Sequence, residues 1–343
     1  MLFLLLCILY KASLSDDQEH FFDLHNTKAM RGFWCIVIMM VHVPMAYTNK
    51  IQDVIGSFAY IGVTFFFMTS SYGLKLSIDK QPGKIKHFWR DRLPKLLIIS
   101  WVVNIFVTIA FIVSGLYTLS LMTIVNILYI NKWVVWLIIC YFFFWITKLI
   151  MGNKNTGNFV VCGLVAVFSM TMYYLVTTGK HGTLTWHTEC YGFIWGILLA
   201  CVDNWFYNYH KEKWLVKLGI SCVIALILGG AYLQFKHVVI AGDYILKIAL
   251  GFAILLFILI ANVKLSFGNS INQFIGEISF EVYLIHGQVY KLLNYGSSGE
   301  LSSGVFIVIS IIITLVCAYI THFIASYLIK QIYKIDFFKR NKD

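Results

Sequence analysis

An arginine and a histidine lie eleven positions apart in an apolar run of membrane-spanning length. The run reads KAMRGFWCIVIMMVHVPMAY from Lys28 to Tyr47, with Arg31 near its start and His42 further along. At about 100° and 1.5 Å per residue, eleven residues make three turns plus ~20°, so the two side chains share one helix face about 16 Å apart. Arg31 would then lie at a bilayer interface and His42 near the midplane.

A histidine at that depth is chemically useful because its side chain can stay neutral. A charged group costs at least ~2.5 kcal/mol at the bilayer centre. A neutral imidazole avoids this cost and is also the form that accepts a proton as a general base. The alternative is that His42 only hydrogen-bonds to a neighbouring helix, and the residue types leave both interpretations open.

Four hydrogen-bonding side chains recur at helical spacing in GEISFEVYLIHGQVY, residues 276–290. Ser279, Tyr283, His286 and Tyr290 fall at i, i+4, i+7 and i+11, so they form one polar stripe on a helix. Such a stripe inside a membrane either lines a cavity or joins helices through a hydrogen-bond network. The sequence does not decide between the two.

A basic loop precedes the third long apolar run. Arg90, Arg92 and Lys95 lie at its end, directly before or within the start of that run. The commoner interpretation is that such a loop fixes topology and contacts anionic lipid. The sharper interpretation is a phosphate site, because the guanidinium fork matches the oxygens of a phosphate group.

One acidic residue, Glu189, ends the loop 179–189, directly before a later apolar run. It is either a second catalytic carboxylate or an acid solvated in its loop, which is the commoner fate. His181 and His187 in the same loop lack the spacing of metal ligands, so we expect no metal site.

The composition is that of an all-α polytopic membrane protein. Of the 343 residues, 59% are hydrophobic and 13% are charged, against ~25% charged in soluble globular proteins. We expect about ten membrane-spanning helices, near residues 30–48, 54–74, 96–114, 133–150, 158–178, 188–203, 214–233, 244–262, 277–294 and 302–328. The moderately apolar stretch 117–131 fits a re-entrant or interfacial segment.

The distribution of positive charge predicts the topology. Of the 27 Lys and Arg residues, 21 fall on one side of the predicted membrane, which places both termini in the cytoplasm. The same distribution argues against nucleic acid as a partner despite the net charge of +11, because no basic–aromatic surface domain is present.

The two ends of the chain differ from the membrane domain between them. Residues 1–24 are an apolar segment followed by an acidic linker. The first ten residues are too short to span a bilayer, which leaves an interfacial helix or the end of a span that begins upstream. Residues 331–343 form a basic tail that we expect in the cytoplasm.

Four stretches together resemble the acyltransferase 3 family of polytopic membrane O-acyltransferases. Arg31 and His42 match the family's basic-x10-His signature. FFFMTSSYGL is similar to its FF-x-x-S-G pattern, with Ser70 as the Ser and Ser71 in place of the usual Gly. RLPKLLI resembles the Arg-rich start of the third span, with Lys95 where a second Arg is common, and GEISFEVYLIH is close to G-x-I-S-Y-x-x-Y-L-x-H.

The resemblance implies a membrane domain over residues 25–330 that uses acyl-CoA, usually acetyl-CoA, as donor. The acceptor is a hydroxyl, commonly on a cell-surface or lipid-linked glycan at the bacterial cytoplasmic membrane. By the same resemblance His42 is the general base, Arg31 lies near the donor, and Arg90, Arg92 and Lys95 hold the nucleotide phosphates. The remaining site-lining candidates are Ser70, Ser279, Tyr283, His286 and Glu189.

Two other classes of function are compatible with the sequence. A proton-coupled transporter or flippase of a small polar solute would use His42 as a proton relay, but no repeated halves typical of transporters are recognisable. A non-catalytic membrane scaffold would need none of the candidate residues. The acceptor, the acyl chain and the formation of a homo-oligomer are left open.

Overall fold

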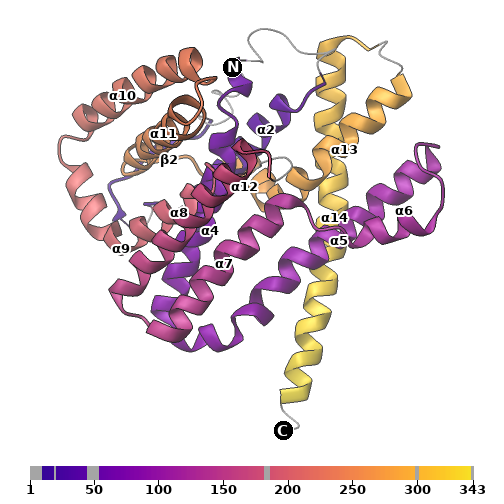
Figure 1. The fold of residues 1–343 in the computed structure, drawn as a ribbon, viewed down its shortest axis with the longest axis horizontal. Coiled ribbons are helices and arrows are strands. Elements are labelled where there is room, and N and C mark those ends of the chain that lie inside the picture. The colour runs from indigo at the N-terminus through magenta and orange to yellow at the C-terminus, as the bar shows by residue number, and fades with distance from the viewer. Residues whose placement is uncertain (1–9, 19–20, 45–53, 181–185, 298–300, 341–343) are drawn as a thin grey trace. The chain divides into compact units, whose positions relative to one another are not determined.

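Helices form almost all of the computed structural model, which describes residues 10–18, 21–44, 54–180, 186–297 and 301–340 (Figure 1). Two strands of two residues each complete it. In chain order the elements are β1 (Ser13–Leu14), α2 (Leu24–Val41), α4 (Tyr60–Lys80), η3 (Pro82–His87), α5 (Phe88–Val113), α6 (Leu121–Val125), η4 (Asn126–Leu128), α7 (Lys132–Met151), α8 (Asn155–Thr177), α9 (Tyr191–Lys211), α10 (Trp214–Phe235), η5 (Ala241–Leu246), α11 (Lys247–Asn262), β2 (Leu265–Ser266), α12 (Ser270–Glu277), α13 (Ser279–Ser297) and α14 (Ser303–Arg340).

The chain divides into two compact units, each assembled from three separate stretches. The first unit comprises Met1–Trp34, Ser57–Lys86 and Val135–Gly276, and the second comprises Cys35–Gly56, His87–Val134 and Glu277–Asp343. Helices α2 and α7 each contribute residues to both.

Seven helical stretches within the described residues are long and apolar enough to cross a membrane. They are Val54–Lys80, Pro82–Val113, Leu121–Met151, Asn155–Thr177, Trp214–Phe235, Ala241–Asn262 and Ser303–Lys334. Seven of the ten predicted spans coincide with them, so the chain is a multi-pass, helical membrane protein. The number ten and the side of each terminus remain predictions.

The other three predicted spans lie in helices that are shorter or less apolar than these seven stretches. They are 30–48, 188–203 and 277–294, and they correspond to α2, α9 and α13 in that order. Residues 45–48 of the first lie outside the described residues. Polar residues lower the hydropathy of these helices, and α13 buries Ser279, Glu281 and His286. Polar side chains inside a membrane protein usually face other helices rather than lipid.

Apolar side chains cover much of the exposed surface of the candidate spans. Helix α10 buries only Ser221, Gly229 and Tyr232. Its exposed apolar residues include Leu215, Val216, Ile220, Val223, Ile224, Leu226 and Ile227. A helix that is apolar around most of its circumference suits a lipid surrounding.

In the first unit, α4 and α9 pack with their backbones in close approach. A Cβ placed on Gly196 of α9 would lie 2.2 Å from the Met68 carbonyl oxygen and 2.0 Å from Ser71 Oγ, and one on Gly192 would lie 2.1 Å from the Thr64 carbonyl oxygen. Only glycine fits at such a crossing. Ser71, which replaces the glycine usual in the family pattern, therefore has its small partner on the opposite helix.

A short β ladder is an addition to the expected all-α fold. Strand β1 pairs antiparallel with β2, with Ser13 opposite Ser266 and Leu14 opposite Leu265. The contact continues where Ser15 N donates to the Lys264 carbonyl oxygen at 2.7 Å and the Lys264 ammonium lies 3.0 Å from the Asp16 carboxylate. This segment of the N-terminal stretch is thus tied to the end of α11 by backbone pairing.

In the second unit, α5, α13 and α14 pack against one another. Phe306 of α14 is fully buried and its ring lies 6.0 Å from that of Tyr290 on α13. At the start of α5, the Asp91 carbonyl oxygen accepts a hydrogen bond from the Tyr333 hydroxyl of α14 at 3.1 Å. The stretch predicted as re-entrant or interfacial forms the short helices α6 and η4.

Candidate functional site

Two histidines from distant parts of the sequence meet in the second unit. The imidazole rings of His42 and His286 lie 5.1 Å apart between centroids, with an angle of 35° between their planes. His286 is 6% exposed, whereas His42 is an exposed residue. The pair thus combines a buried residue with one at the surface of the unit.

The local sequence explains why His42 stands where a helix ends. Helix α2 stops at Val41, and His42 N donates to the Met39 carbonyl oxygen in the closing turn. Pro44 follows two residues later, and a proline disfavours helical geometry at the residue before it. His42 therefore stands just past the end of α2 rather than inside a continuous span.

Arg31 lies in α2 within the first unit, and its side chain is half-buried. Because His42 belongs to the second unit, the expected 16 Å between the two side chains stays a prediction. Gly32, next in sequence, fixes this part of α2 against α12, since a Cβ there would lie 2.2 Å from the Asn272 carbonyl oxygen. The backbone that carries Arg31 is thus held within its own unit.

The predicted polar stripe of α13 makes a continuous set of contacts. The Tyr283 and Tyr290 rings lie 5.9 and 6.0 Å from the His286 ring on either side of it. The Tyr290 hydroxyl donates to the Met39 carbonyl oxygen at 2.6 Å. At the other end of the stripe, Cys35 Sγ donates to the Ser279 carbonyl oxygen at 3.3 Å. Of the two interpretations left open, these contacts favour a helix–helix network, and they fix the end of α2 beside His286.

The His286 ring has a defined hydrogen-bonding role. Its Nδ1 lies 3.1 Å from the Val282 carbonyl oxygen, one turn earlier on α13. A carbonyl oxygen can only accept, so Nδ1 carries the proton and Nε2 of the neutral ring is an acceptor. The ring is therefore fixed in one tautomer.

The three basic candidates lie in the first two turns of α5, in the second unit. Arg90 and Arg92 are half-buried, and Lys95 is exposed. The Arg90 guanidinium bonds only weakly to its neighbour Asp91, at 3.3 and 3.4 Å. Positive side chains beside the N-terminal N–H groups of a helix suit an anionic group.

Ser70 belongs to the first unit, on α4, and is half-buried. It lies one residue before Ser71, the residue that packs against Gly196. The structure therefore places Ser70 beside a helix crossing, in a different unit from His42 and His286.

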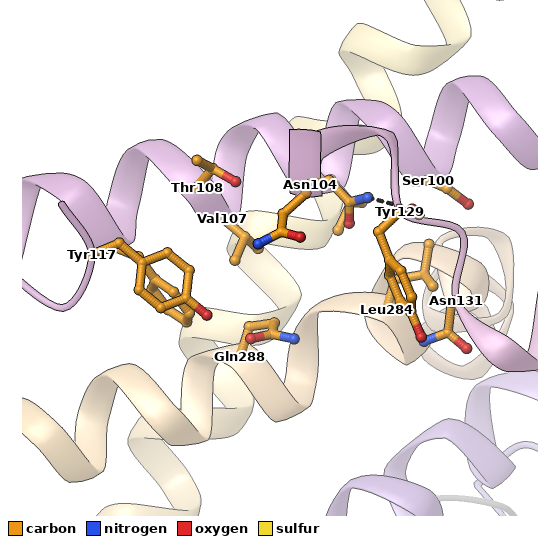
Figure 2. A pocket seen from close by; sticks show the side chains of 12 residues that line it. Ser100, Asn104, Val107, Thr108, Tyr117, Tyr129, Asn131, Leu284 and Gln288 are labelled. Carbon is orange, nitrogen blue, oxygen red and sulfur yellow. Dashed lines mark hydrogen bonds between the residues drawn. The ribbon is translucent and has the colours of Figure 1, made fainter. Parts of the chain in front are cut away.

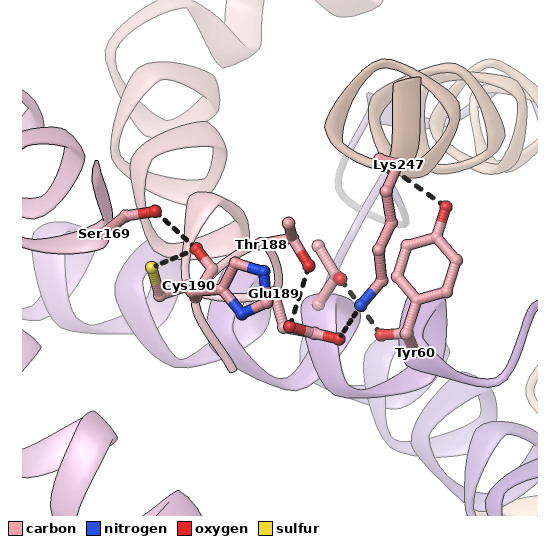
Figure 3. Close-up of polar contacts among 8 residues, drawn as sticks. Tyr60, Ser169, Thr188, Glu189, Cys190 and Lys247 are labelled. Atoms are coloured by element: carbon pink, nitrogen blue, oxygen red, sulfur yellow. Dashed lines mark hydrogen bonds and ion pairs between the residues drawn. The ribbon is translucent and has the colours of Figure 1, made fainter. Parts of the chain in front are cut away.

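Glu189 is not a solvated loop acid, because its side chain is only 4% exposed. Its carboxylate lies 2.8 Å from the Lys247 ammonium and accepts a hydrogen bond from Thr188 Oγ1 at 2.9 Å (Figure 3). The Tyr60 hydroxyl donates to the Lys247 carbonyl oxygen at 2.9 Å, and the Lys247 ammonium lies 4.7 Å from the Tyr60 ring centre. These contacts join the starts of α4, α9 and α11 and argue for a structural role.

His187, beside this ion pair, packs against two tyrosine rings whose own centroids lie 4.6 Å apart. The Tyr173 ring lies 5.4 Å away at 25° and the Tyr244 ring 5.8 Å away at 7°. Burial lowers the pKa of His187 to about 4, against an opposing effect of the Glu189 carboxylate. The imidazole is therefore neutral at neutral pH. Its Nδ1 has no hydrogen-bond partner among the residues that the structure describes.

Two interactions were missed because their partners are far apart in the sequence. One is Lys247, the partner of Glu189. The other joins His322 to Glu281. His322 Nδ1 lies 2.8 Å from the Glu281 carboxylate, and Glu281 is 1% exposed. Glu281 follows Ser279 of the polar stripe by two residues, and this position is a signal that could have pointed to the pair.

Comparison with known proteins identifies one family. The model of an acyltransferase domain, acyltransferase 3, matches residues 24–323, which is nearly the whole chain. Neither the curated proteins nor the solved structures give a significant match. Within the described ranges, no three His, Cys, Asp or Glu side chains are grouped closely enough to hold a metal ion.

Proposed function

Because this chain belongs to the acyltransferase 3 family, we propose that it is a membrane O-acyltransferase that moves an acetyl group from acetyl-CoA to a hydroxyl of a glycan. The glycan is a cell-surface or lipid-linked one, and the membrane is the cytoplasmic membrane of a bacterium. The contact between the rings of the exposed His42 and the buried His286 is the observation that carries the proposal.

In the proposed reaction, His42 is the general base. Its neutral imidazole takes the proton of the acceptor hydroxyl while the hydroxyl oxygen attacks the thioester carbonyl carbon. The carbon–sulfur bond then breaks, the ester is released, and the departing thiolate of CoA takes the proton back from the imidazolium. No covalent enzyme intermediate is needed, which agrees with a site whose reactive groups are imidazoles.

His286 is a positioning residue in this mechanism. Its Nδ1 proton is committed to the Val282 carbonyl oxygen, so the ring keeps its orientation while His42 gains and loses a proton. The Tyr290 hydroxyl, bonded to the Met39 carbonyl oxygen, fixes the end of α2 three residues before His42. Ser279 and Tyr283 on the same stripe are the proposed lining of the site.

The donor would be held by the basic residues at the start of α5. Arg90, Arg92 and Lys95 are placed to bind the phosphates of CoA, with the positive end of the helix adding to the attraction. Arg31 would act nearer the thioester end of the same donor. On the predicted topology these residues face the cytoplasm, where acetyl-CoA is made.

Replacing His42 by alanine tests this proposal directly. Purified protein in liposomes, supplied with labelled acetyl-CoA and bacterial polysaccharide, should transfer label to the glycan, and His42→Ala should abolish that transfer. His237→Ala, at another exposed histidine, is the matched control and should remain active. Unchanged transfer by His42→Ala would reject the mechanism, and proton-coupled solute flux without any acyl-CoA would favour a transporter instead.

A further inference from the structure

The second unit contains a polar cavity that the proposed reaction does not use. It has a volume of about 220 Å³ and lies between α5, the stretch 117–131 and α13 (Figure 2). Its lining includes Asn104, Thr108, Tyr117, Tyr129, Asn131 and Gln288. A cavity this rich in amides and hydroxyls is unusual beside apolar helices, where each polar group must find a partner.

The lining is polar but carries no charge. Every described residue around the cavity is an amide, a hydroxyl residue or an apolar one. Side-chain amides present two N–H donors and an acceptor oxygen, and hydroxyls both donate and accept. This matches a ligand whose own groups donate and accept without ionising.

Tyrosine rings stand at the two ends of the cavity. The Tyr117 ring packs edge-on against Phe111 at 5.0 Å and 90°, and its hydroxyl accepts a hydrogen bond from the Lys291 ammonium at 3.2 Å. Asn104 Nδ2 donates to the Tyr129 carbonyl oxygen at 2.7 Å and so fixes the backbone that carries the second ring. Rigid tyrosines offer an apolar face to the C–H groups of a ligand and a hydroxyl to its polar groups.

Gln288 lies between these rings on the α13 side (Figure 2). Its side chain is exposed, and its amide forms no hydrogen bond with the described part of the chain. Asn104 and Asn131, by contrast, are bonded to the backbone of the stretch 117–133. Gln288 is therefore a lining amide that is available to a ligand.

The volume limits the ligand to one small unit. Pockets that enclose drug-sized molecules measure ~300–1,000 Å³, so a cavity of 220 Å³ suits a single sugar ring better than a whole nucleotide. Gln288 follows His286 by two residues, or about 200° around α13, so the two side chains point to opposite sides of the helix. The cavity therefore lies on the other side of α13 from His286 and would hold a part of the acceptor that is remote from the reacting hydroxyl.

The stretch 117–131 also exposes large apolar side chains around the cavity. Those of Leu121, Met122 and Leu128 are 79, 71 and 64% exposed. This apolar exterior suits a lipid surrounding, which the lipid part of a lipid-linked ligand would share.

From these observations we infer that the cavity between α5, the stretch 117–131 and α13 binds a neutral sugar unit of a lipid-linked acceptor. That this sugar belongs to the acceptor rests on the proposed function. Sugar binding itself can be measured without any acyl transfer. Gln288 supplies hydrogen bonds to the sugar hydroxyls, and Tyr129 supplies a ring face.

Saturation-transfer NMR on the full chain in nanodiscs tests the inference. The probes are the methyl glycosides of glucose, galactose, rhamnose and N-acetylglucosamine. At least one should bind, and Gln288→Leu and Tyr129→Ala should each weaken that binding about fivefold to tenfold, the loss expected for one or two neutral hydrogen bonds or a ring contact. Tyr295→Ala, at an exposed tyrosine outside the cavity, is the matched control and should bind as the parent does.

The outcomes separate this inference from the proposed function. His42→Ala should keep the sugar signal even though it loses acetyl transfer, so the two claims can fail independently. The inference is overturned if no glycoside binds, or if binding is the same in Gln288→Leu. Native mass spectrometry gives one further outcome that would overturn it. If the parent protein and Tyr295→Ala retain a bound phospholipid that Gln288→Leu and Tyr129→Ala both lose, the cavity holds a lipid head group and not a sugar.

Discussion

The Glu189 carboxylate and the Lys247 ammonium form an ion pair at 2.8 Å, with 4 and 18% of the two side chains exposed. They are 58 residues apart in the sequence and join the start of α9 to the start of α11. The attraction between two buried charges roughly offsets the cost of removing both from water, whereas a buried charge left alone has no such compensation.

Removing one member of this pair should therefore cost more than removing both. Lys247→Met leaves a buried carboxylate without its cation and should lower the free energy of unfolding by about 3–5 kcal/mol. The double variant Glu189→Gln/Lys247→Met should recover most of that loss. Thermal unfolding in detergent measures both, with Lys180→Met at an exposed lysine as control; a double variant no better than Lys247→Met would contradict the prediction.

Adding a methyl group to α9 should separate it from α4. Gly196→Ala places a carbon 2.2 Å from a backbone oxygen, so we expect a loss of stability of about 1–3 kcal/mol. The matched control is Gly219→Ala in α10, where no atom lies within 4 Å. This control should be neutral or stabilise by about 0.5–1 kcal/mol. Equal effects of the two changes would show that the crossing is not tightly packed.

Acid should weaken the first unit through His187. Its folded-state pKa of about 4 lies below the value of ~6.5 in an unfolded chain, so the unfolded state binds the proton first. The stabilisation is complete above pH ~6.5 and is lost progressively as the pH falls toward 4, by about 1–3 kcal/mol. His187→Phe keeps the stacking and should flatten this part of the pH profile, whereas His237→Ala should leave it unchanged.

The Tyr290 hydroxyl should matter for catalysis as well as for folding. Tyr290→Phe removes the shorter of two hydrogen bonds to the Met39 carbonyl oxygen and leaves the one from His42 N, at a cost of about 0.5–1.5 kcal/mol. Because the bond fixes the end of α2, acetyl transfer should fall about tenfold at saturating donor while the KM for acetyl-CoA stays constant. Tyr295→Phe, at an exposed tyrosine, is the control; a change confined to KM would contradict a role near His42.

Donor binding should depend on the guanidinium of Arg92. Arg92→Gln would remove the proposed charge-assisted contact to phosphate and should raise the KM for acetyl-CoA about tenfold or more, with little change in kcat. Lys154→Gln, at an exposed lysine before α8, should not alter it. A donor KM that is the same in Arg92→Gln would leave α5 with a role in topology alone.

Local patterns in the sequence predict most of the helices but not their partners. Apolar runs identify the seven long apolar stretches, and the spacing of Tyr283, His286 and Tyr290 predicts their common face. Burial of Glu189 is not predictable locally, because its cation comes from a helix 58 residues later. The pairing of β1 with β2 and the division into two units likewise depend on contacts that no local pattern encodes.

The meeting of α2 and α12 has a consequence for how this chain can vary. A Cβ on Gly276 would lie 1.8 Å from the Lys28 carbonyl oxygen, just as one on Gly32 would strike the Asn272 carbonyl oxygen, so each helix presents a glycine to the other's main chain. Neither position can accept any side chain while the other helix stays in place. In a mutational scan, both glycines would tolerate substitution as poorly as a catalytic residue, although neither performs chemistry. Intolerance to substitution alone would therefore direct attention to the packing of α2 on α12 and away from His42.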